Sequence, residues 1–226
     1  MLTALYTVII YPLYQIVEFV YRVFFAVFTN TGIAIVGVSI VITLLCLPLY
    51  DVAEKWQEIE RDTQKKMSYR VGRIKKAFKG DERYMMLSAY NRLMGYNPFM
   101  ALRSSFGILI QIPFFLAAYK FLSHNPDLQG RAFLFIRDMG EPDKLFTVGG
   151  FGINVLPIVM TAINITAGAI YTKGFAIKDK VQVYGMALVF LVLLYNSPAG
   201  LVFYWTMNNV FSLVKHIFYK LKDPLK

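Results

Sequence analysis

The chain has 226 residues, of which 57% are hydrophobic, 16% aromatic and 17% charged. This composition is too apolar for an ordinary soluble domain, and it predicts one membrane domain with a polar appendage. The net charge of +10 does not indicate DNA binding, because eighteen of the 24 basic residues lie in segments that we expect on one side of a membrane. The lone Cys46 excludes an intramolecular disulfide.

Residues 1–32 form the first predicted segment, an amphipathic helix on the outer membrane surface. Residues 2–28 are almost all apolar or aromatic and carry Glu18 and Arg22 four positions apart. An ion pair at this spacing, together with several tyrosines, suits a helix that lies in the membrane interface. The same stretch is also long enough to cross a bilayer, and this second interpretation stays open.

The basic stretch 51–97 holds eleven Lys or Arg residues directly after a predicted span, Ile33 to Tyr50. Positively charged loops remain in the cytoplasm, so this stretch fixes the direction of every span. Its apolar positions recur every three or four residues, which predicts an amphipathic helix. These positions are Val52, Trp56, Ile59, Thr63, Met67, Val71, Ile74 and Phe78. Gly80 predicts a left-handed turn and Asp81 the cap of a returning helix, so we expect a cytoplasmic helical hairpin.

Four more apolar segments complete an all-α membrane protein with five transmembrane helices. The segments are Phe99 to Leu122, Phe151 to Tyr171, Val181 to Ser197 and Leu201 to Tyr219. The polar loop 123–149 lies outside, with Phe133 to Ile136 as a short surface helix or wedge. We therefore expect a five-span core over residues 33–219 and a basic, cytoplasmic C-terminal tail over residues 220–226.

No catalytic constellation is visible in the sequence, so we do not expect an enzyme. His124 and His216 fall in loops on opposite sides, and no Cys/His spacing indicates a metal site. No cofactor motif is found. The apolar spans between Ile33 and Tyr219 contain no Asp or Glu, which argues against a proton-coupled transporter.

Amide and hydroxyl side chains recur along single faces of the predicted spans. An amide side chain that faces lipid costs free energy, so we expect these faces to point inward. They either bond neighbouring helices together or line a water-accessible groove that receives another polypeptide. The candidate groove residues are Ser39, Thr43, Arg103, Ser104, Gln111, Asn154, Thr161, Asn164, Asn208, Asn209 and Ser212. Arg103, the one charge well inside an apolar segment, either snorkels to cytoplasmic headgroups or faces the groove.

Several short motifs in order resemble the YidC family of membrane protein insertases, relatives of the mitochondrial oxidase-assembly and chloroplast Albino proteins. The motifs are QIPFFL at 111–116, LPIVM at 156–160, SPAGLVFYW at 197–205 and the pair Asn208-Asn209. The resemblance implies an insertase and chaperone of the bacterial inner membrane whose clients are nascent membrane proteins. It also implies a hydrophilic groove that is open to cytoplasm and lipid. Such a protein is expected to act alone or beside the Sec translocon, on chains that the ribosome delivers. The basic hairpin would meet the incoming chain, the ribosome or anionic lipid.

One position departs from the family pattern. Members usually carry an Arg five residues before a Pro-Leu pair, and here Thr43 precedes Pro48 at that distance. The role implied for that Arg, attraction of acidic client tails, does not transfer to Thr43, and we expect Arg103 to supply the charge instead. A specialised assembly factor for one membrane partner, or a small-solute transporter, are the alternative functions.

Overall fold

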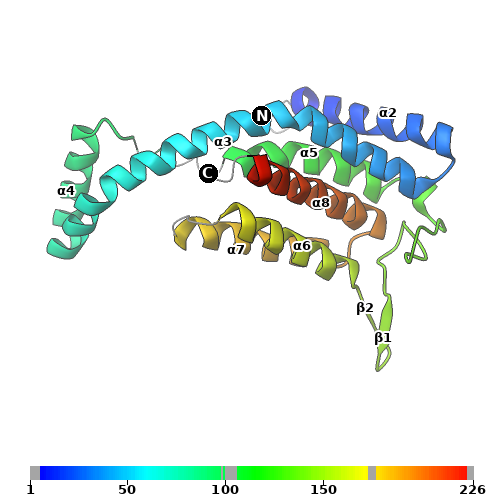
Figure 1. The fold of residues 1–226 in the computed structure, drawn as a ribbon. Coiled ribbons are helices and arrows are strands. Elements are labelled where there is room, and N and C mark those ends of the chain that lie inside the picture. The colour runs from blue at the N-terminus through cyan, green and yellow to red at the C-terminus, as the bar shows by residue number, and fades with distance from the viewer. Residues whose placement is uncertain (1–5, 98, 100–105, 173–176, 223–226) are drawn as a thin grey trace. The chain divides into compact units, whose positions relative to one another are not determined.

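A computed structural model of the protein describes residues 6–97, 99, 106–172 and 177–222, and most of these are helical. The elements are the π-helical turn η1 (Tyr6–Ile10), α2 (Tyr11–Phe28), α3 (Thr31–Ala77), α4 (Gly80–Leu93), α5 (Phe106–Ser123), the 3-10 turn η3 (Pro126–Leu128), strands β1 (Phe146–Val148) and β2 (Phe151–Ile153), α6 (Leu156–Tyr171), α7 (Ile177–Leu194) and α8 (Ala199–Lys222) (Figure 1). The predicted helical fold is confirmed at this level. The chain forms two compact units, one of residues 1–45 with 113–226 and one of residues 46–112.

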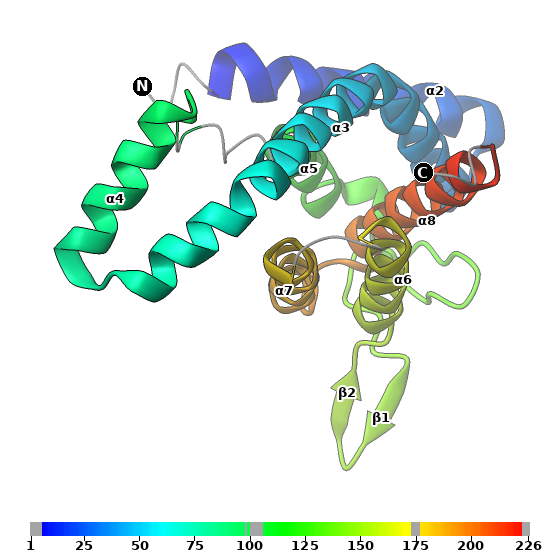
Figure 2. The same ribbon diagram turned by 60° about the vertical axis from the view of Figure 1, so that its left-hand side comes forward.

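Helix α8 is the central element of the first unit, and its residues 199–206 are all buried. The Trp205 ring packs edge-on against Phe115 of α5, with ring centroids 4.9 Å apart, and lies tilted against the Phe190 ring of α7, with centroids 4.7 Å apart. Helix α8 also packs extensively along α6, and the two run side by side in Figures 1 and 2. Large aromatic side chains therefore fix α8 among its neighbours.

Helices α6 and α7 approach closely at a glycine. A Cβ placed on Gly168 would lie 2.8 Å from the Val183 Cγ1 atom, so a larger residue there would require Val183 to shift. Helix α6 begins at Leu156, whereas the sequence predicted that this span starts at Phe151. The preceding residues instead form an antiparallel pair with β1, in which Val148 lies opposite Phe151. The sequence did not predict this β-hairpin.

The segment between α5 and β1 closes one end of the first unit. The Phe133 and Ile136 backbones exchange hydrogen bonds of 2.9 Å in each direction. Leu134 between them has a φ of +52°. Of the two alternatives predicted for Phe133 to Ile136, the surface helix is therefore wrong, because the chain turns back on itself there, and the wedge stays a prediction.

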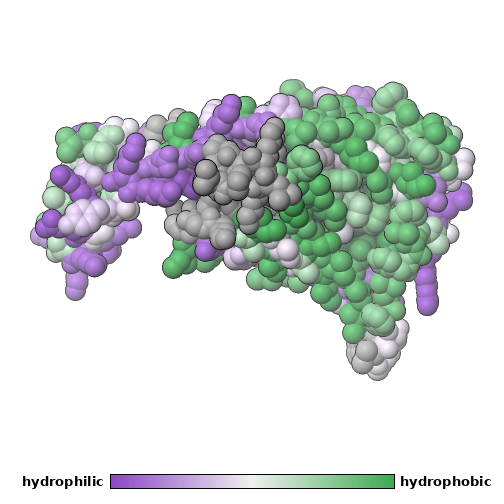
Figure 3. Space-filling model, viewed as in Figure 1, coloured by the Kyte–Doolittle hydropathy of each residue, from purple (hydrophilic) through white to green (hydrophobic). Residues whose placement is uncertain are grey.

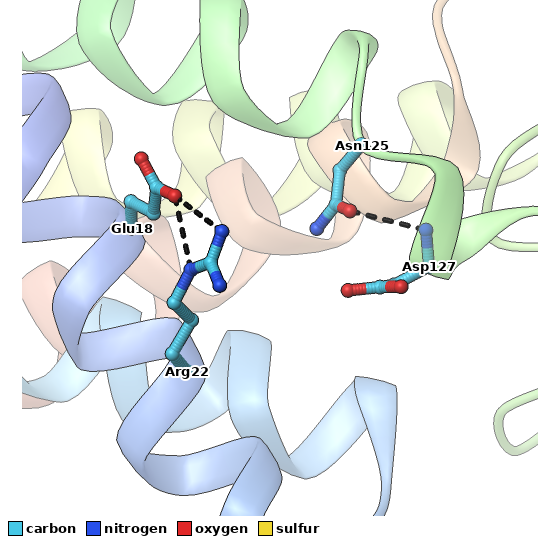
Figure 4. Close-up of polar contacts among 4 residues, drawn as sticks. All are labelled: Glu18, Arg22, Asn125 and Asp127. Atoms are coloured by element: carbon cyan, nitrogen blue, oxygen red, sulfur yellow. Dashed lines mark hydrogen bonds and ion pairs between the residues drawn. The ribbon is translucent and has the colours of Figure 1, made fainter.

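Helix α2 packs on α3 and α5 within the first unit. Phe24 contacts α3 at Gly37, where a Cβ would lie 2.4 Å from the ring. Tyr21 meets Phe121 of α5 edge-on, with centroids 5.2 Å apart. The predicted Glu18–Arg22 pair forms at 2.6 Å (Figure 4). Tyr6–Phe28 is long and apolar enough to cross a membrane by length and composition alone, and the interfacial location stays a prediction.

The second unit contains the polar part of α3 and the whole of α4. Figure 3 shows hydrophilic side chains gathered there, whereas apolar side chains dominate the visible face of the helical bundle. Helix α3 continues through Pro48 without interruption. Gly80 has the predicted left-handed φ, +54°. The predicted cap was wrong, since Lys79 is the N-cap residue of α4 and Asp81 lies in its first turn.

The buried face of α3 in this unit differs from the predicted apolar stripe. Ala53, Glu60 and Met67, each seven residues apart, are buried. Val52, Trp56 and Ile59 of the predicted stripe are exposed, and the two faces coincide only from Met67 onward. Apolar periodicity located the helix but placed its inner face one residue too early.

Candidate functional site: a polar seam along α8

The candidate site lies along the second half of α8, where the side chains are less buried than in the first half. All residues of 199–206 are buried, whereas residues 207, 208 and 210–213 are half-buried. Of the predicted groove residues, Asn208 and Ser212 lie in this looser part, and Asn209 beside them is buried. Helix α8 thus passes from a closed apolar end to a partly open polar end.

Hydrogen bonds between α3 and α8 bring four polar groups together. The Ser39 hydroxyl lies 3.0 Å from the Ile35 carbonyl oxygen in its own helix and 3.4 Å from that of Tyr204. One turn further along each helix, the Thr43 hydroxyl donates to the Asn208 side-chain oxygen at 3.5 Å. The structure therefore places Ser39, Thr43 and Asn208 on one seam, as the sequence predicted for an inward-facing set.

Two side-chain donors on α8 are buried without a hydrogen-bond partner among the described residues. They are Asn209 Nδ2 and Trp205 Nε1. Buried donors of this kind are rare in proteins, and bound water often satisfies them. Asn164 on α6 is half-buried and makes no hydrogen bond to a described residue. The seam thus combines the hydrogen-bonded groups of Ser39, Thr43 and Asn208 with two buried α8 donors that lack a partner among the described residues.

Other predicted residues lie elsewhere. Asn154 precedes α6 rather than forming part of its polar face, and its amide donates to the Tyr195 carbonyl at 2.7 Å and to the Asn196 side chain at 3.3 Å. Thr161 is buried and donates to the Pro157 carbonyl within α6 at 2.8 Å. Gln111 belongs to the second unit. Arg103 and Ser104 lie outside the described residues.

Sequence reasoning missed the residues that close the end of the bundle where α6 and α8 begin. The Asp143 carboxylate accepts hydrogen bonds from the backbone N–H groups of Val155, at 2.7 Å, and Leu156, at 3.1 Å. The backbone N–H groups of Ala199 and Gly200 donate to the carbonyls of Glu141 and Met139, both at 2.8 Å. No local pattern reveals Asp143, because it caps a helix twelve residues away.

A buried carboxylate in the second unit also escaped notice. Glu60 is 2% exposed and accepts hydrogen bonds from the Tyr96 hydroxyl, at 2.5 Å, and the Gln64 amide, at 2.8 Å. Burial, and then the hydrogen bond and charge of Glu60, raise the pKa of Tyr96 to about 12. Residues 46–97 contain no group of three metal-ligating side chains that could hold an ion.

The chain is similar to known proteins in sequence and in fold. A family model described as 60Kd inner membrane protein matches residues 23–224. Two curated relatives are both named membrane protein insertase YidC. That of Sinorhizobium fredii is 31% identical over 219 residues, which cover 90% of this chain and 35% of the relative. That of Treponema denticola is 25% identical over 222 residues, which cover 91% of this chain and 37% of the relative.

A solved structure described as active YidC insertase with the first transmembrane domain resolved matches with a TM-score of 0.62. It is 24% identical, and the match covers 90% of this chain and 45% of that one; this likeness shows the fold. The chain belongs to the 60Kd inner membrane protein family, and the resemblance to YidC proteins noted in its motifs is confirmed. It spans about a third of the length of these curated relatives.

Proposed function

We propose that this chain is a membrane protein insertase and chaperone, which receives nascent membrane proteins in a hydrophilic groove and releases them sideways into lipid. The family membership and the names of its relatives support this activity. The single structural observation that carries it is the change along α8, from the fully buried residues 199–206 to half-buried Asn208 and Ser212. A groove closed at one end and wet at the other requires this change.

The physical task explains why neutral polar groups would suit the groove. A client's polar tail must cross about 30 Å of hydrocarbon, and each charge costs a few kcal/mol at the bilayer centre. Water held beside Asn208, Asn209 and Ser212 would shorten the dry path. Amides and hydroxyls solvate a tail without selecting one sequence. Burial of the client's apolar segment, worth roughly 25 cal/mol per Å², would drive release.

In the topology that we propose, the five spans run through α3, α5, α6, α7 and α8. The α3–α4 pair then forms the cytoplasmic helical hairpin, and the C-terminus lies in the cytoplasm of a bacterial cell with the protein in its inner membrane. The basic residues gathered in 51–97 support this direction. Helix α6 has only 16 residues, which favours local bilayer thinning. Ribosomes, the Sec translocon and anionic lipids are the proposed partners besides the clients.

Complementation of an insertase-depleted bacterium tests the function. The native chain should restore growth and client insertion, measured by protease protection. A variant with Asn208→Leu and Ser212→Leu should insert clients poorly at equal expression. Thr166→Leu is the matched control, since Thr166 is exposed on α6 and bonds only its own helix. Equal insertion by the native chain and the double variant would refute a groove on α8.

The positive charge of the groove is proposed to come from Arg103. Arg103→Ala should impair the insertion of clients with acidic tails and spare clients with neutral tails, because only the former gain from a cation. Arg103→Lys should retain most of the activity. Unchanged insertion of acidic-tailed clients by Arg103→Ala would discard this role.

A specialised assembly factor is the second candidate. Thr43, which stands where family members usually carry an Arg, is uncharged and hydrogen-bonded to Asn208. Good expression without rescue of the depleted strain would favour this candidate over a general insertase.

A further inference from the structure

We infer that the turn of residues 133–136 is a lipid anchor, which inserts Leu134 and Phe135 into the headgroup boundary of the bilayer beside the starts of α3 and α8. The inference rests on the membrane location of the bundle and on the direction that we propose for α3 and α8. It does not depend on whether the chain inserts clients.

The base of this turn is rigid. The Phe133 ring covers Gly32 in the first turn of α3, where a Cβ would lie only 2.0 Å from the ring carbon Cγ. The same ring meets Phe203 of α8 edge-on, with centroids 5.4 Å apart. Ile136 is fully buried, and its backbone is doubly bonded to that of Phe133. The Phe133 side chain therefore anchors the turn to α3 and α8, and Ile136 is buried beside it.

The tip of the turn points two large apolar side chains away from the protein. Leu134 is 75% exposed and Phe135 is 54% exposed. Leu134 also has a φ of +52°, a conformation that costs a non-glycine residue about 1 kcal/mol or more. A fold that strains its backbone to expose leucine and phenylalanine gains nothing in water, because both side chains lose their burial there.

Two basic residues on either side of the tip indicate that its partner is a lipid surface. Arg131 and Arg137 flank the turn, both exposed, and neither forms an ion pair with a described residue. Guanidinium groups bind phosphates through paired hydrogen bonds. Apolar side chains between basic ones match the boundary between acyl chains and phosphate headgroups. A lipid surface offers both halves of this chemistry at once.

The position of the turn fits this partner. Gly32 lies in the first turn of α3, and Phe203 lies five residues into the 24-residue α8. In the proposed topology both helices enter the membrane from the same side. The ends of spans lie at the lipid–water interface, where aromatic residues gather. The tip is therefore held at the depth where insertion needs no further movement.

The experiment uses the full chain with Cys46→Ala, reconstituted into vesicles of phosphatidylcholine and phosphatidylglycerol. A fluorophore is attached at Leu134→Cys, at Phe135→Cys, or at Thr147→Cys as a control, since Thr147 is an exposed polar residue of the neighbouring β-hairpin. Spin-labelled lipid should quench the fluorescence at positions 134 and 135 several-fold more than at 147. Aqueous iodide should show the opposite order.

Two results would overturn the anchor. Equal iodide quenching at all three positions would place the tip in water. Protection from both quenchers would mean that protein covers it. A variant with Arg131→Gln and Arg137→Gln should reduce quenching by spin-labelled lipid at position 134 more in vesicles rich in phosphatidylglycerol than in phosphatidylcholine alone. No change in either vesicle would remove the arginines from the inference.

Discussion

The hydroxyl of Tyr96 donates a 2.5 Å hydrogen bond to the buried carboxylate of Glu60, and so ties the chain that follows α4 to the middle of α3. Gln64 donates to the same carboxylate oxygen. Residues 94–97, which follow α4, are thus attached to α3 through Tyr96.

Removing the Tyr96 hydroxyl should loosen this attachment. Tyr96→Phe leaves the buried Glu60 with one donor, and losing a hydrogen bond to a buried charged group costs roughly 1 to 3 kcal/mol. Amide hydrogen exchange at residues 94–97 should accelerate. Tyr69→Phe is the control, because Tyr69 is exposed on the same helix α3. Unchanged exchange in Tyr96→Phe would show that the hydrogen bond does not hold this segment.

The titration of Tyr96 supplies a second prediction. Burial and the neighbouring Glu60 raise its pKa to about 12, above the ordinary value of 10.0. The unfolded chain therefore releases this proton first as the pH rises. The contribution of Tyr96 to stability should be intact below pH 10 and be lost as the pH approaches 12. The difference in ultraviolet absorbance between the native chain and Tyr96→Phe measures the tyrosinate; titration near pH 10 would contradict the prediction.

Asp143 should stabilise the start of α6 more than its loop position suggests. Its carboxylate accepts from two backbone N–H groups, and removing an N-cap acceptor costs about 1 kcal/mol. Asp143→Ala should lower the thermal midpoint and speed amide exchange at Val155 and Leu156. Asp143→Asn, which keeps an acceptor, should lose less.

Glu141→Gln is the control for that experiment, since the Glu141 side chain is exposed and only its backbone carbonyl bonds α8. If Glu141→Gln lowered the thermal midpoint as much as Asp143→Ala, the effect would come from the negative charge of the loop. The specific cap by Asp143 would then be disproved.

Two glycines of α3 should respond oppositely to the same substitution. At Gly37 an added Cβ would collide with the Phe24 ring, whereas nothing lies within 4 Å of the Cβ position on Gly72. Gly37→Ala should therefore destabilise the packing of α2. Gly72→Ala should stabilise α3 by about 0.5 to 1 kcal/mol, because alanine is the better helix former. Thermal unfolding of both variants in one detergent makes the comparison, and the same sign for both would contradict it.

Sequence periodicity predicted most helices because apolar faces and composition set them locally. The predicted start of a helix at Phe151 was wrong because residues 151–153 form a β-hairpin with β1, and α6 begins only after it. Pairing between strands cannot be recognised from an apolar run. The predicted inner face of α3 was off by one residue because Glu60, an acidic residue, is buried and hydrogen-bonded to Tyr96 and Gln64. A hydropathy pattern assigns any lone carboxylate to the surface.

The polar seam could be predicted only in part. Ser39, Thr43 and Asn208 were expected to face inward and do meet. Asn154 was expected on the inward face of the span Phe151 to Tyr171. Its side chain bonds Tyr195 and Asn196 instead, because α6 had not yet begun. Helical spacing carries information only inside the helix.

The starts of α6 and α8 have a consequence for the permeability of the membrane. The first four backbone N–H groups of α8, from Ala199 to Val202, all have carbonyl acceptors, and Asp143 serves the start of α6. Bare amides at a hydrocarbon edge would draw in water and give protons a path. With these backbone amides hydrogen-bonded, the starts of α6 and α8 offer fewer polar groups to water, so the groove that we propose along the second half of α8 would leak fewer ions across the membrane.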